Sequence, residues 1–322
     1  MNPSINKKMW AIILVAIFAV SIPFTTAGAA DKPKFSFIVK DMTNPYYLRM
    51  SEGARQAAED LGVELTWLAA KFNGDIEGQI ALVESQIIKK PDCLILVPMN
   101  AVALVPKIRE CNQKGIPVVT ADTRSKEGAA DVISFVGLDE KESAVGMAKF
   151  LVKHLNGKGK IAILEGYRGS STAEERLKGF HEVLDNESGI EIVASVSAEW
   201  DREKGLKATE DILQAHPDVN AILASNDEMA LGAVQAVKTA GKLDQIVIVG
   251  DDAIPAVLDA LKAGELLATI DGNTDKVGYE AVQTAYRAVV KKEEVPKWVV
   301  VPSTILTKED VTAEYLKSRG IE

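Results

Sequence analysis

The sequence predicts an α/β protein made of two similar lobes, each with a parallel sheet at its core. Short β-branched runs alternate with longer segments of helical period, which is typical of α/β folds. Nearly all of these runs are continuously apolar, as expected for parallel strands with helices on both faces. A weak internal repeat indicates the two lobes, because residues 53–65 resemble residues 179–192.

The predicted elements begin with a strand at residues 35–39 and a helix at residues 46–61. Further strands are predicted at residues 63–68, 93–97, 118–121, 132–136, 161–164, 190–196, 221–224, 246–249 and 267–270. The segments between them carry amphipathic stripes; Ile80, Val83 and Ile87, for example, fall on one face of a helix. Such a stripe is expected to face the core.

The N-terminal segment has the parts of an export signal. Two lysines precede an apolar run over residues 9–20, and small residues follow it. The run is too short to span a bilayer, and the small residues suit a cleavage site. We therefore expect residues 1–30 to be a signal peptide that is cleaved near Ala29 and Ala30. Because no cysteine lies near that point, a lipid anchor is not expected.

Size and charge limit the classes of partner. Removing 30 of the 322 residues leaves 292, more than one hydrophobic core usually serves. The leader holds two of the 37 basic residues, so the mature chain has 35 basic and 46 acidic residues, a net charge of −11. Such a surface repels nucleic acid and anionic lipid, and we expect neither as a partner.

Cys93 and Cys111 are the only cysteines, and neither has a CxxC partner or a nearby histidine. A metal or redox site is therefore not expected. Cys93 opens a predicted strand and Cys111 lies late in the next helix. One interpretation is a disulfide formed in an oxidising compartment, and the other is a pair of buried free thiols that act as small apolar residues.

Hydrogen-bonding and aromatic side chains gather where the predicted strands end. Six loops have this character: residues 40–47, 122–124, 165–171, 200–202, 226–228 and 251–252. The carboxyl ends of parallel strands are the usual place for ligands in open sheets. Taken singly, Asn226 or Ser170 is explained as a helix cap and Trp200 as a core side chain. Together the loops favour a sugar, whose C–H faces suit aromatic rings and whose hydroxyls pair with Asp, Asn and Arg.

Four segments carry a family resemblance. AHPDV at residues 215–219 is followed by ASNDEMALG at residues 224–232, with NPYY at residues 44–47 and GELLATI at residues 264–270. In combination they resemble the sugar-binding proteins of the ribose and galactose group, the type I periplasmic binding proteins. The chain is most similar to the ribose-binding branch, over essentially the whole mature sequence.

The resemblance implies two Rossmann-like lobes joined by a three-segment hinge. The N-terminal lobe would comprise residues 31–137 plus 273–301, and the C-terminal lobe residues 138–272 plus 302–322. The implied protein is a soluble monomer in the periplasm of a Gram-negative cell and uses no cofactor. It would capture a monosaccharide (a pentose or hexose) or a related polyol between closing lobes, for a membrane ABC permease.

Carried over by position, the resemblance implies a set of ligand-binding residues: Asn44, Tyr46, Tyr47, Asp122, Arg176, Trp200, Asn226 and Asp252. The aromatic rings would enclose the sugar ring. Asp122 and Asp252 would accept hydrogen bonds from hydroxyls, and Arg176 and Asn226 would donate them.

Three departures from the ribose binders leave the sugar unidentified. Thr123 separates Asp122 from Arg124, which displaces the guanidinium by one residue. Asn273 stands near the position of a glutamine, and two tyrosines and a tryptophan replace smaller phenylalanine rings. Further candidate ligand contacts at the cleft edge are Lys40, Asp41, Arg124 and Asn273.

Three other functions need weighing. A carbohydrate-active enzyme would use a carboxylate pair such as Asp122 and Asp252. However, the three histidines lie outside the strand-end loops, and no GxSxG, HExxH or P-loop motif occurs, so we expect no catalytic residue. A transcriptional regulator would need a DNA-binding head where this chain has its leader. An exported receptor that presents its ligand to a chemoreceptor or sensor kinase stays open as an alternative.

Overall fold

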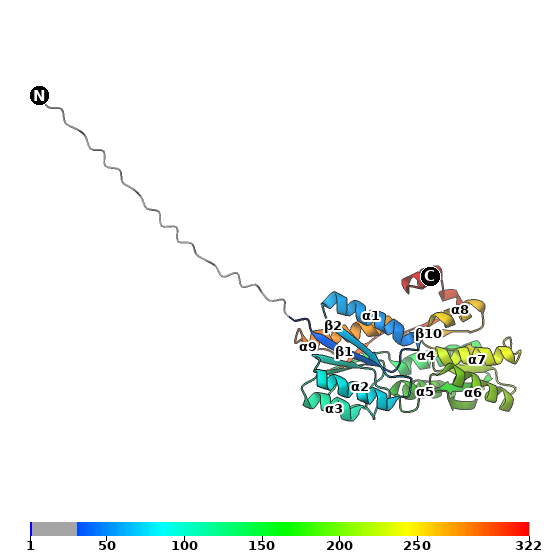
Figure 1. The fold of residues 1–322 in the computed structure, drawn as a ribbon. Helices are drawn as coiled ribbons and strands as arrows, with labels where there is room; N and C mark the ends of the chain where they lie inside the picture. The colour runs from blue at the N-terminus through cyan, green and yellow to red at the C-terminus, as the bar shows by residue number, and fades with distance from the viewer. Residues whose placement is uncertain (2–30, 322) are drawn as a thin grey trace. The chain divides into compact units, whose positions relative to one another are not determined.

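The computed structural model describes Met1 and residues 31–321, so the predicted signal peptide and its cleavage site lie outside the described residues. The segment Lys32–Glu322 forms one compact unit. It contains two parallel sheets, each at the core of an α/β lobe, which confirms the predicted fold class (Figure 1).

The first sheet has six parallel strands in the order β11-β5-β4-β3-β1-β2. The strands are β1 (Lys34–Val39), β2 (Glu64–Ala69), β3 (Cys93–Leu96), β4 (Val118–Ala121), β5 (Phe135–Gly137) and β11 (Trp298–Val300). One face is covered by α1 (Pro45–Leu61) and α9 (Thr274–Val289), and the other by α2 (Ile76–Lys89) and α3 (Val105–Gln113) (Figure 1). Burial on both faces explains why the strands are continuously apolar.

The second sheet has four parallel strands in the order β7-β6-β8-β9. The strands are β6 (Gly159–Glu165), β7 (Ile190–Ser197), β8 (Ala221–Ala224) and β9 (Val247–Val249). The covering helices are α4 (Glu140–His154) and α5 (Ser171–Leu184) on one face, and α6 (Arg202–Ala215), α7 (Asp227–Thr239) and α8 (Pro255–Ala263) on the other. The two lobes therefore have the same layered construction.

The last predicted strand is placed differently by the structure. β10 (Thr269–Asp271) pairs antiparallel with β12 (Thr304–Leu306), and beside it Ala268 alone makes a parallel bridge, to Val249. Neither β11 nor β12 was predicted, because each has three residues, too few to show a periodicity. β5 likewise begins at Phe135, later than predicted, since the residues before it are not paired as a strand.

The chain passes between the two sheets at three places. It leaves the first sheet after β5 and enters α4, and it returns after β10 into α9, which packs on α1. β11 then pairs with β5 before β12 pairs with β10. The chain continues through a 3₁₀ turn (Lys308–Asp310) and α10 (Ala313–Ser318). The residue limits of the lobes stay a prediction.

Cys93 and Cys111 are buried free thiols, so the second of the two interpretations of these cysteines holds. Cys93 belongs to the apolar cluster beneath α1 and α9, whereas Cys111 belongs to the cluster beneath α2 and α3. The two side chains therefore pack on opposite faces of the first sheet. Burial raises the pKa of the Cys111 thiol to about 11.

Candidate ligand-binding site

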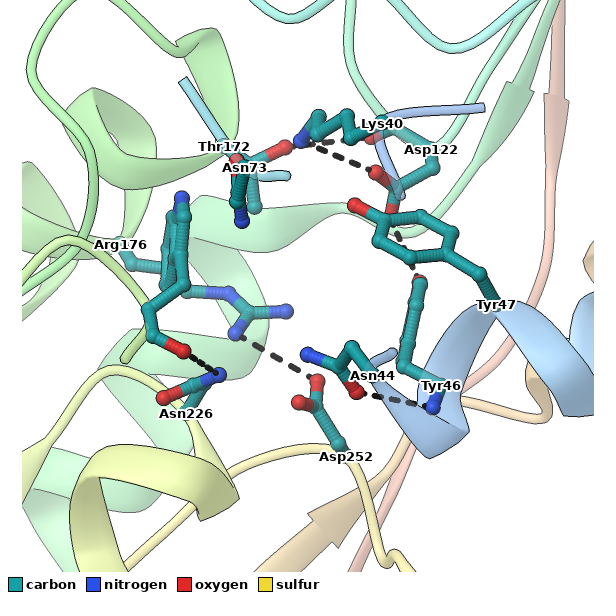
Figure 2. Close-up of a pocket in the computed structure, with 11 residues that line it drawn as sticks. Lys40, Asn44, Tyr46, Tyr47, Asn73, Asp122, Thr172, Arg176, Asn226 and Asp252 are labelled. Carbon is teal, nitrogen blue, oxygen red and sulfur yellow. Dashed lines mark hydrogen bonds and ion pairs between the residues drawn. The ribbon is translucent and has the colours of Figure 1, made fainter. Parts of the chain in front are cut away.

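A cavity lies at the carboxyl ends of strands from both sheets (Figure 2). The space between its lining residues, open solvent included, is about 320 Å³. It is lined by Lys40, Asn44, Tyr46, Tyr47, Asn73, Asp122, Thr172, Arg176, Trp200, Asn226 and Asp252. The structure thus brings together all eight residues that the resemblance implied; their contact with a ligand stays a prediction.

The start of α1 supplies one wall of the cavity. Asn44 caps the helix by accepting a hydrogen bond from the Tyr46 backbone N–H on its Oδ1 (2.9 Å), and Pro45 takes the first helical position. Tyr46 and Tyr47 then enter the first turn with their rings edge to face, 5.2 Å between centroids. The Tyr46 hydroxyl donates to Asp122 Oδ1 at 2.5 Å, and burial followed by the Asp122 charge raises the pKa of this phenol.

Asp122 follows β4 in a tight turn with left-handed backbone (φ 60°). The N–H of Thr123 donates to the carbonyl of Ala121 at 2.5 Å, which closes a three-residue γ-turn around Asp122. Lys40, which follows β1, donates from Nζ to Thr123 Oγ1 at 2.7 Å and lies 3.5 Å from Asp122 Oδ2. A buried cation and a buried carboxylate thus stand side by side in the first lobe's half of the cavity.

Arg176 of α5 is the centre of the second lobe's half. Its Nε donates to Glu140 Oε2 at 2.7 Å and its Nη1 to the Ser225 carbonyl at 2.5 Å. Nη2 lies 3.2 Å from Asp251 Oδ1, and Nη1 lies 3.9 Å from Asp252 Oδ1. The guanidinium is therefore fixed by protein groups on several sides, which leaves its remaining N–H groups for a ligand.

The buried carboxyls around Arg176 titrate abnormally. Burial raises the pKa of Glu140, Asp251 and Asp252, while the Arg176 charge opposes the rise. Asp227, which accepts hydrogen bonds from Thr269 and the Ile254 N–H, has its pKa raised by burial to about 7. More carboxyls than cations are buried here, so the second lobe's half has an excess of acidic groups.

Trp200 and Asn226 complete the second lobe's half. Asn226 caps α7, with Oδ1 accepting from the Met229 N–H at 3.0 Å. Trp200 is only 8% exposed, belongs to the apolar core and has a left-handed backbone (φ 66°), as has Asp252 (φ 131°). Among the described residues, Trp200 Nε1 and Asn73 Oδ1 are buried without a hydrogen-bond partner. An unpaired buried donor and an unpaired acceptor in one cavity call for a ligand that supplies both roles.

The four further candidates divide into one inside the cavity and three outside it. Lys40 lines the cavity. Asp41 instead accepts from the backbone N–H groups of Thr43 and Asn44 and shapes the loop before α1. Arg124 points away, with its guanidinium 3.8 Å from the ring centre of Phe135.

Asn273 is the third residue outside the cavity. It donates from Nδ2 to the Pro302 carbonyl at 2.9 Å, beside one passage between the lobes, and accepts from Arg319 at 3.0 Å. In this structure it therefore joins chain segments and is not among the residues that line the cavity.

Sequence reasoning missed two lining residues, Asn73 and Thr172. Asn73 lies in the loop after β2, one of several strands whose following loops were not singled out. Thr172 lies in the first turn of α5, where it reads as an ordinary helix-start residue. A uniform search of every strand-end loop would have found Asn73, whereas nothing in the sequence separates Thr172 from its neighbours.

The described residues hold no group of His, Cys, Asp and Glu side chains arranged to bind a metal ion. Among the same residues, no helix is long and apolar enough to cross a membrane.

Two α/β lobes with a polar and aromatic cavity at their strand ends define a two-lobed ligand-binding protein. The family model described as a periplasmic binding protein domain matches residues 35–293, and the chain belongs to this family. Its location in the periplasm follows from that membership.

Three similar proteins illustrate the family. The D-ribose/D-allose-binding protein of Pseudomonas aeruginosa is 32% identical over 290 residues, 88% of this chain and 91% of the relative. An ABC transporter periplasmic solute binding protein from Actinobacillus succinogenes, solved with bound D-allose, is 33% identical with a TM-score of 0.82, over 87% of this chain and 99% of that chain. A solute binding protein of Bacillus halodurans, solved with bound myo-inositol, is 28% identical with a TM-score of 0.82, over 89% of this chain and 98% of that chain.

Proposed function

We propose that this protein captures a neutral monosaccharide or related polyol in its cavity and delivers it to a membrane ABC permease. The ligands named for the similar proteins, D-ribose, D-allose and myo-inositol, support this class. The description of the two solved structures as ABC transporter components supports the permease. The observation that carries the proposal is a small cavity lined by three aromatic residues and by both donors and acceptors. Catalysis and presentation to a chemoreceptor are not part of the proposal.

Ligand hydroxyl groups fit the hydrogen-bond donors and acceptors of the cavity lining that are not used within the protein. Asn44 uses its Oδ1 to cap α1, which leaves its side-chain N–H groups for a ligand. Asp252 Oδ1 lies 3.9 Å from Arg176, beyond hydrogen-bonding distance. Leaving a buried polar atom unpaired costs about 1–3 kcal/mol. A hydroxyl both donates and accepts, so a polyhydroxylated ring can pair Trp200 Nε1 and Asn73 Oδ1 together.

The charges around the cavity favour a neutral ligand. Two cations, Lys40 and Arg176, face Asp122 and Asp252, and Glu140 and Asp251 lie behind Arg176. Both cations are already paired with carboxylates. A phosphate or carboxylate on the sugar would meet this acidic surplus at low dielectric, where like charges repel strongly. We therefore expect sugar phosphates and sugar acids to be rejected.

Closure of the lobes on the ligand is part of the proposal. Loops of the two lobes already touch beside the cavity, where the Ala101 N–H donates to the Gly169 carbonyl at 2.9 Å and the Arg124 N–H to Ser171 Oγ at 2.8 Å. The ligand favours this closed arrangement only by the contacts that it adds to it. Micromolar affinity corresponds to about −8 kcal/mol, within reach of several hydrogen bonds and aromatic contacts.

The test is native mass spectrometry of protein purified from a rich extract, followed by a thermal-shift screen of pentoses, hexoses, inositols and other polyols. We expect a bound mass in the monosaccharide range and stabilisation by at least one neutral compound. Asp252→Ala should remove the shift, and the exposed Asp259→Ala on α8 should keep it. If none of these compounds stabilises the wild-type protein, the proposal is wrong.

A further inference from the structure

We propose that Thr123, which does not line the cavity, positions Lys40 and Asp122 and couples them to the second lobe. The inference rests on the proposed function, because it concerns how this cavity selects its ligand. Thr123 is fully buried, and it is the residue that separates Asp122 from Arg124.

The γ-turn at the end of β4 decides where three consecutive side chains go. Because the chain reverses at Asp122, the carboxylate of that residue lines the cavity while the Thr123 hydroxyl lies beside it, 2.9 Å from Asp122 Oδ2. Arg124 is carried past the cavity and lies between Phe135 and Trp298, with ring centres at 3.8 and 4.0 Å. The displaced arginine thus leaves Lys40 as the cation beside Asp122.

Proton counting fixes the direction of two hydrogen bonds at Thr123. A hydroxyl has one proton to donate and two lone pairs. The Lys40 amine, 2.7 Å away, donates, and the Asp122 carboxylate accepts. Thr123 therefore accepts from Lys40 and donates to Asp122. Because the Thr123 proton is directed to Asp122, the Thr172 hydroxyl, 3.1 Å away, approaches Thr123 as a donor and divides its single proton between Thr123 Oγ1 and the Asp122 carbonyl at 3.2 Å.

Thr172 belongs to the other lobe, at the start of α5. Its Oγ1 also lies 3.2 Å from the Asp122 carbonyl, and the neighbouring Ser171 accepts from the Arg124 N–H. When the lobes separate, Thr123 loses the Thr172 contact, and its bonds to Lys40 and Asp122 are no longer held from both sides. The arrangement of the Lys40 and Asp122 pair is therefore tied to closure of the cleft.

This arrangement defines what the ligand must present at that point. Lys40 donates one of its three N–H groups to Thr123 and directs another toward Asp122, which leaves one for the ligand. Asp122 can accept one further bond on Oδ1 besides that from Tyr46. A ligand hydroxyl satisfies both groups at once, because it accepts from Lys40 and donates to Asp122, whereas a deoxy position satisfies neither.

The experiment compares Thr123→Val, which keeps the shape and removes the hydroxyl, with Thr123→Ser, which keeps the hydroxyl. Thr209→Val is the matched control, because Thr209 is equally buried and bonds only to Gly205 within α6. The probes are D-allose, D-ribose and myo-inositol, measured by calorimetry. The loss of hydrogen bonds to charged groups should weaken binding by roughly 10- to 100-fold in Thr123→Val. Thr123→Ser and Thr209→Val should bind close to wild type.

A double-mutant cycle with Lys40→Met separates positioning from simple packing. If Thr123 acts through Lys40, the effects of Thr123→Val and Lys40→Met on affinity should be strongly non-additive. Small-angle scattering of the ligand-free proteins should show Thr123→Val more open than wild type and Thr209→Val unchanged. Equal affinity of Thr123→Val and wild type, or full additivity with Lys40→Met, would overturn the inference alone. Failure of all three probes to bind wild-type protein, together with failure of every compound in the thermal-shift screen, would instead remove its basis in the proposed function.

Discussion

The two halves of the cavity are held in place by different physical means. In the first lobe, a capped helix start and packed tyrosines carry the ligand-facing groups, with one cation beside one lining carboxylate. In the second lobe, Arg176 is enclosed by Glu140 and Asp251, with Asp252 next to it. Recognition and stability are therefore largely separable in the first half, whereas in the second half the same charges serve both.

Replacing Arg176 should have the largest effect. Arg176→Met removes the cation that lies beside three buried carboxyls, and breaking a buried ion pair costs about 3–5 kcal/mol. We expect a large loss of unfolding free energy in urea denaturation, reduced at low pH because the carboxyls can then be protonated. Lys40→Met is the first-lobe counterpart and should lose far less stability. Equal losses in the two variants would contradict the contrast between the halves.

Asp252 is the exception among the second lobe's charges, because it lies beyond hydrogen-bonding distance of Arg176, and Asp252→Asn should separate binding from stability there. Asparagine has nearly the same shape as aspartate, so it should add no strain at this unusual backbone position (φ 131°), and it removes a buried charge that is not hydrogen-bonded to Arg176. The unfolding free energy should therefore stay the same or rise. Affinity for the ligand found by the screen should fall by roughly 10- to 100-fold, because a charged acceptor is lost. Calorimetry that shows unchanged affinity would remove Asp252 from the site.

Trp200→Phe should have a smaller effect and distinguishes the indole N–H from the ring. The unpaired Nε1 disappears, so ligand-free stability should change by less than about 1 kcal/mol. Binding should weaken by about tenfold, the value of one hydrogen bond. Trp200→Ala should instead destabilise the protein, since the indole also belongs to the second lobe's core. Normal affinity in Trp200→Phe would show that Nε1 stays unpaired with ligand bound.

The raised pKa of Asp227 predicts a pH dependence that belongs to the second lobe. Between its ordinary pKa of 3.8 and its raised pKa of about 7, the folded state binds more proton than the unfolded state. The contribution of Asp227 to the free energy of unfolding is therefore fully present below pH 3.8 and is lost as pH rises through about 7. The free energy of unfolding should fall by at most about 1.4 kcal/mol per pH unit in this range. Urea denaturation from pH 4 to pH 8 should show this slope flattened in Asp227→Asn and kept in Asp259→Asn.

The two thiols should give the smallest effect and report on the first lobe alone. Because Cys93 and Cys111 are buried and free, a reducing agent should leave the melting temperature unchanged, and a thiol reagent should react only when the first lobe opens. If Arg176→Met loses the structure of the second lobe while Cys93 and Cys111 still react slowly with the reagent, the first lobe has stayed folded and the two lobes unfold separately. Fast labelling of the folded wild-type protein would contradict the burial.

The sequence predicted the site better than the path of the chain around it. Parallel strands end at one edge, so listing strand-end residues was enough to place Asp122, Asn226 and Asp252 in one cavity. Arg124 and Asn273 lie outside the cavity because a single γ-turn and a single passage between lobes redirect a side chain without any change in residue type. The pairing of β10 with β12 was missed for a similar reason, since it depends on segments far apart in the chain.

Three cavity-lining residues, Asp122, Trp200 and Asp252, have left-handed backbone, a conformation that few side chains adopt without strain. Evolutionary or engineered change at these positions is therefore restricted by the backbone, whatever the ligand. Lys40, Asn73 and Thr172 carry no such restriction. We therefore expect substitutions that change the sugar preference to occur first at Lys40, Asn73 and Thr172, and the three residues with left-handed backbone to stay unchanged.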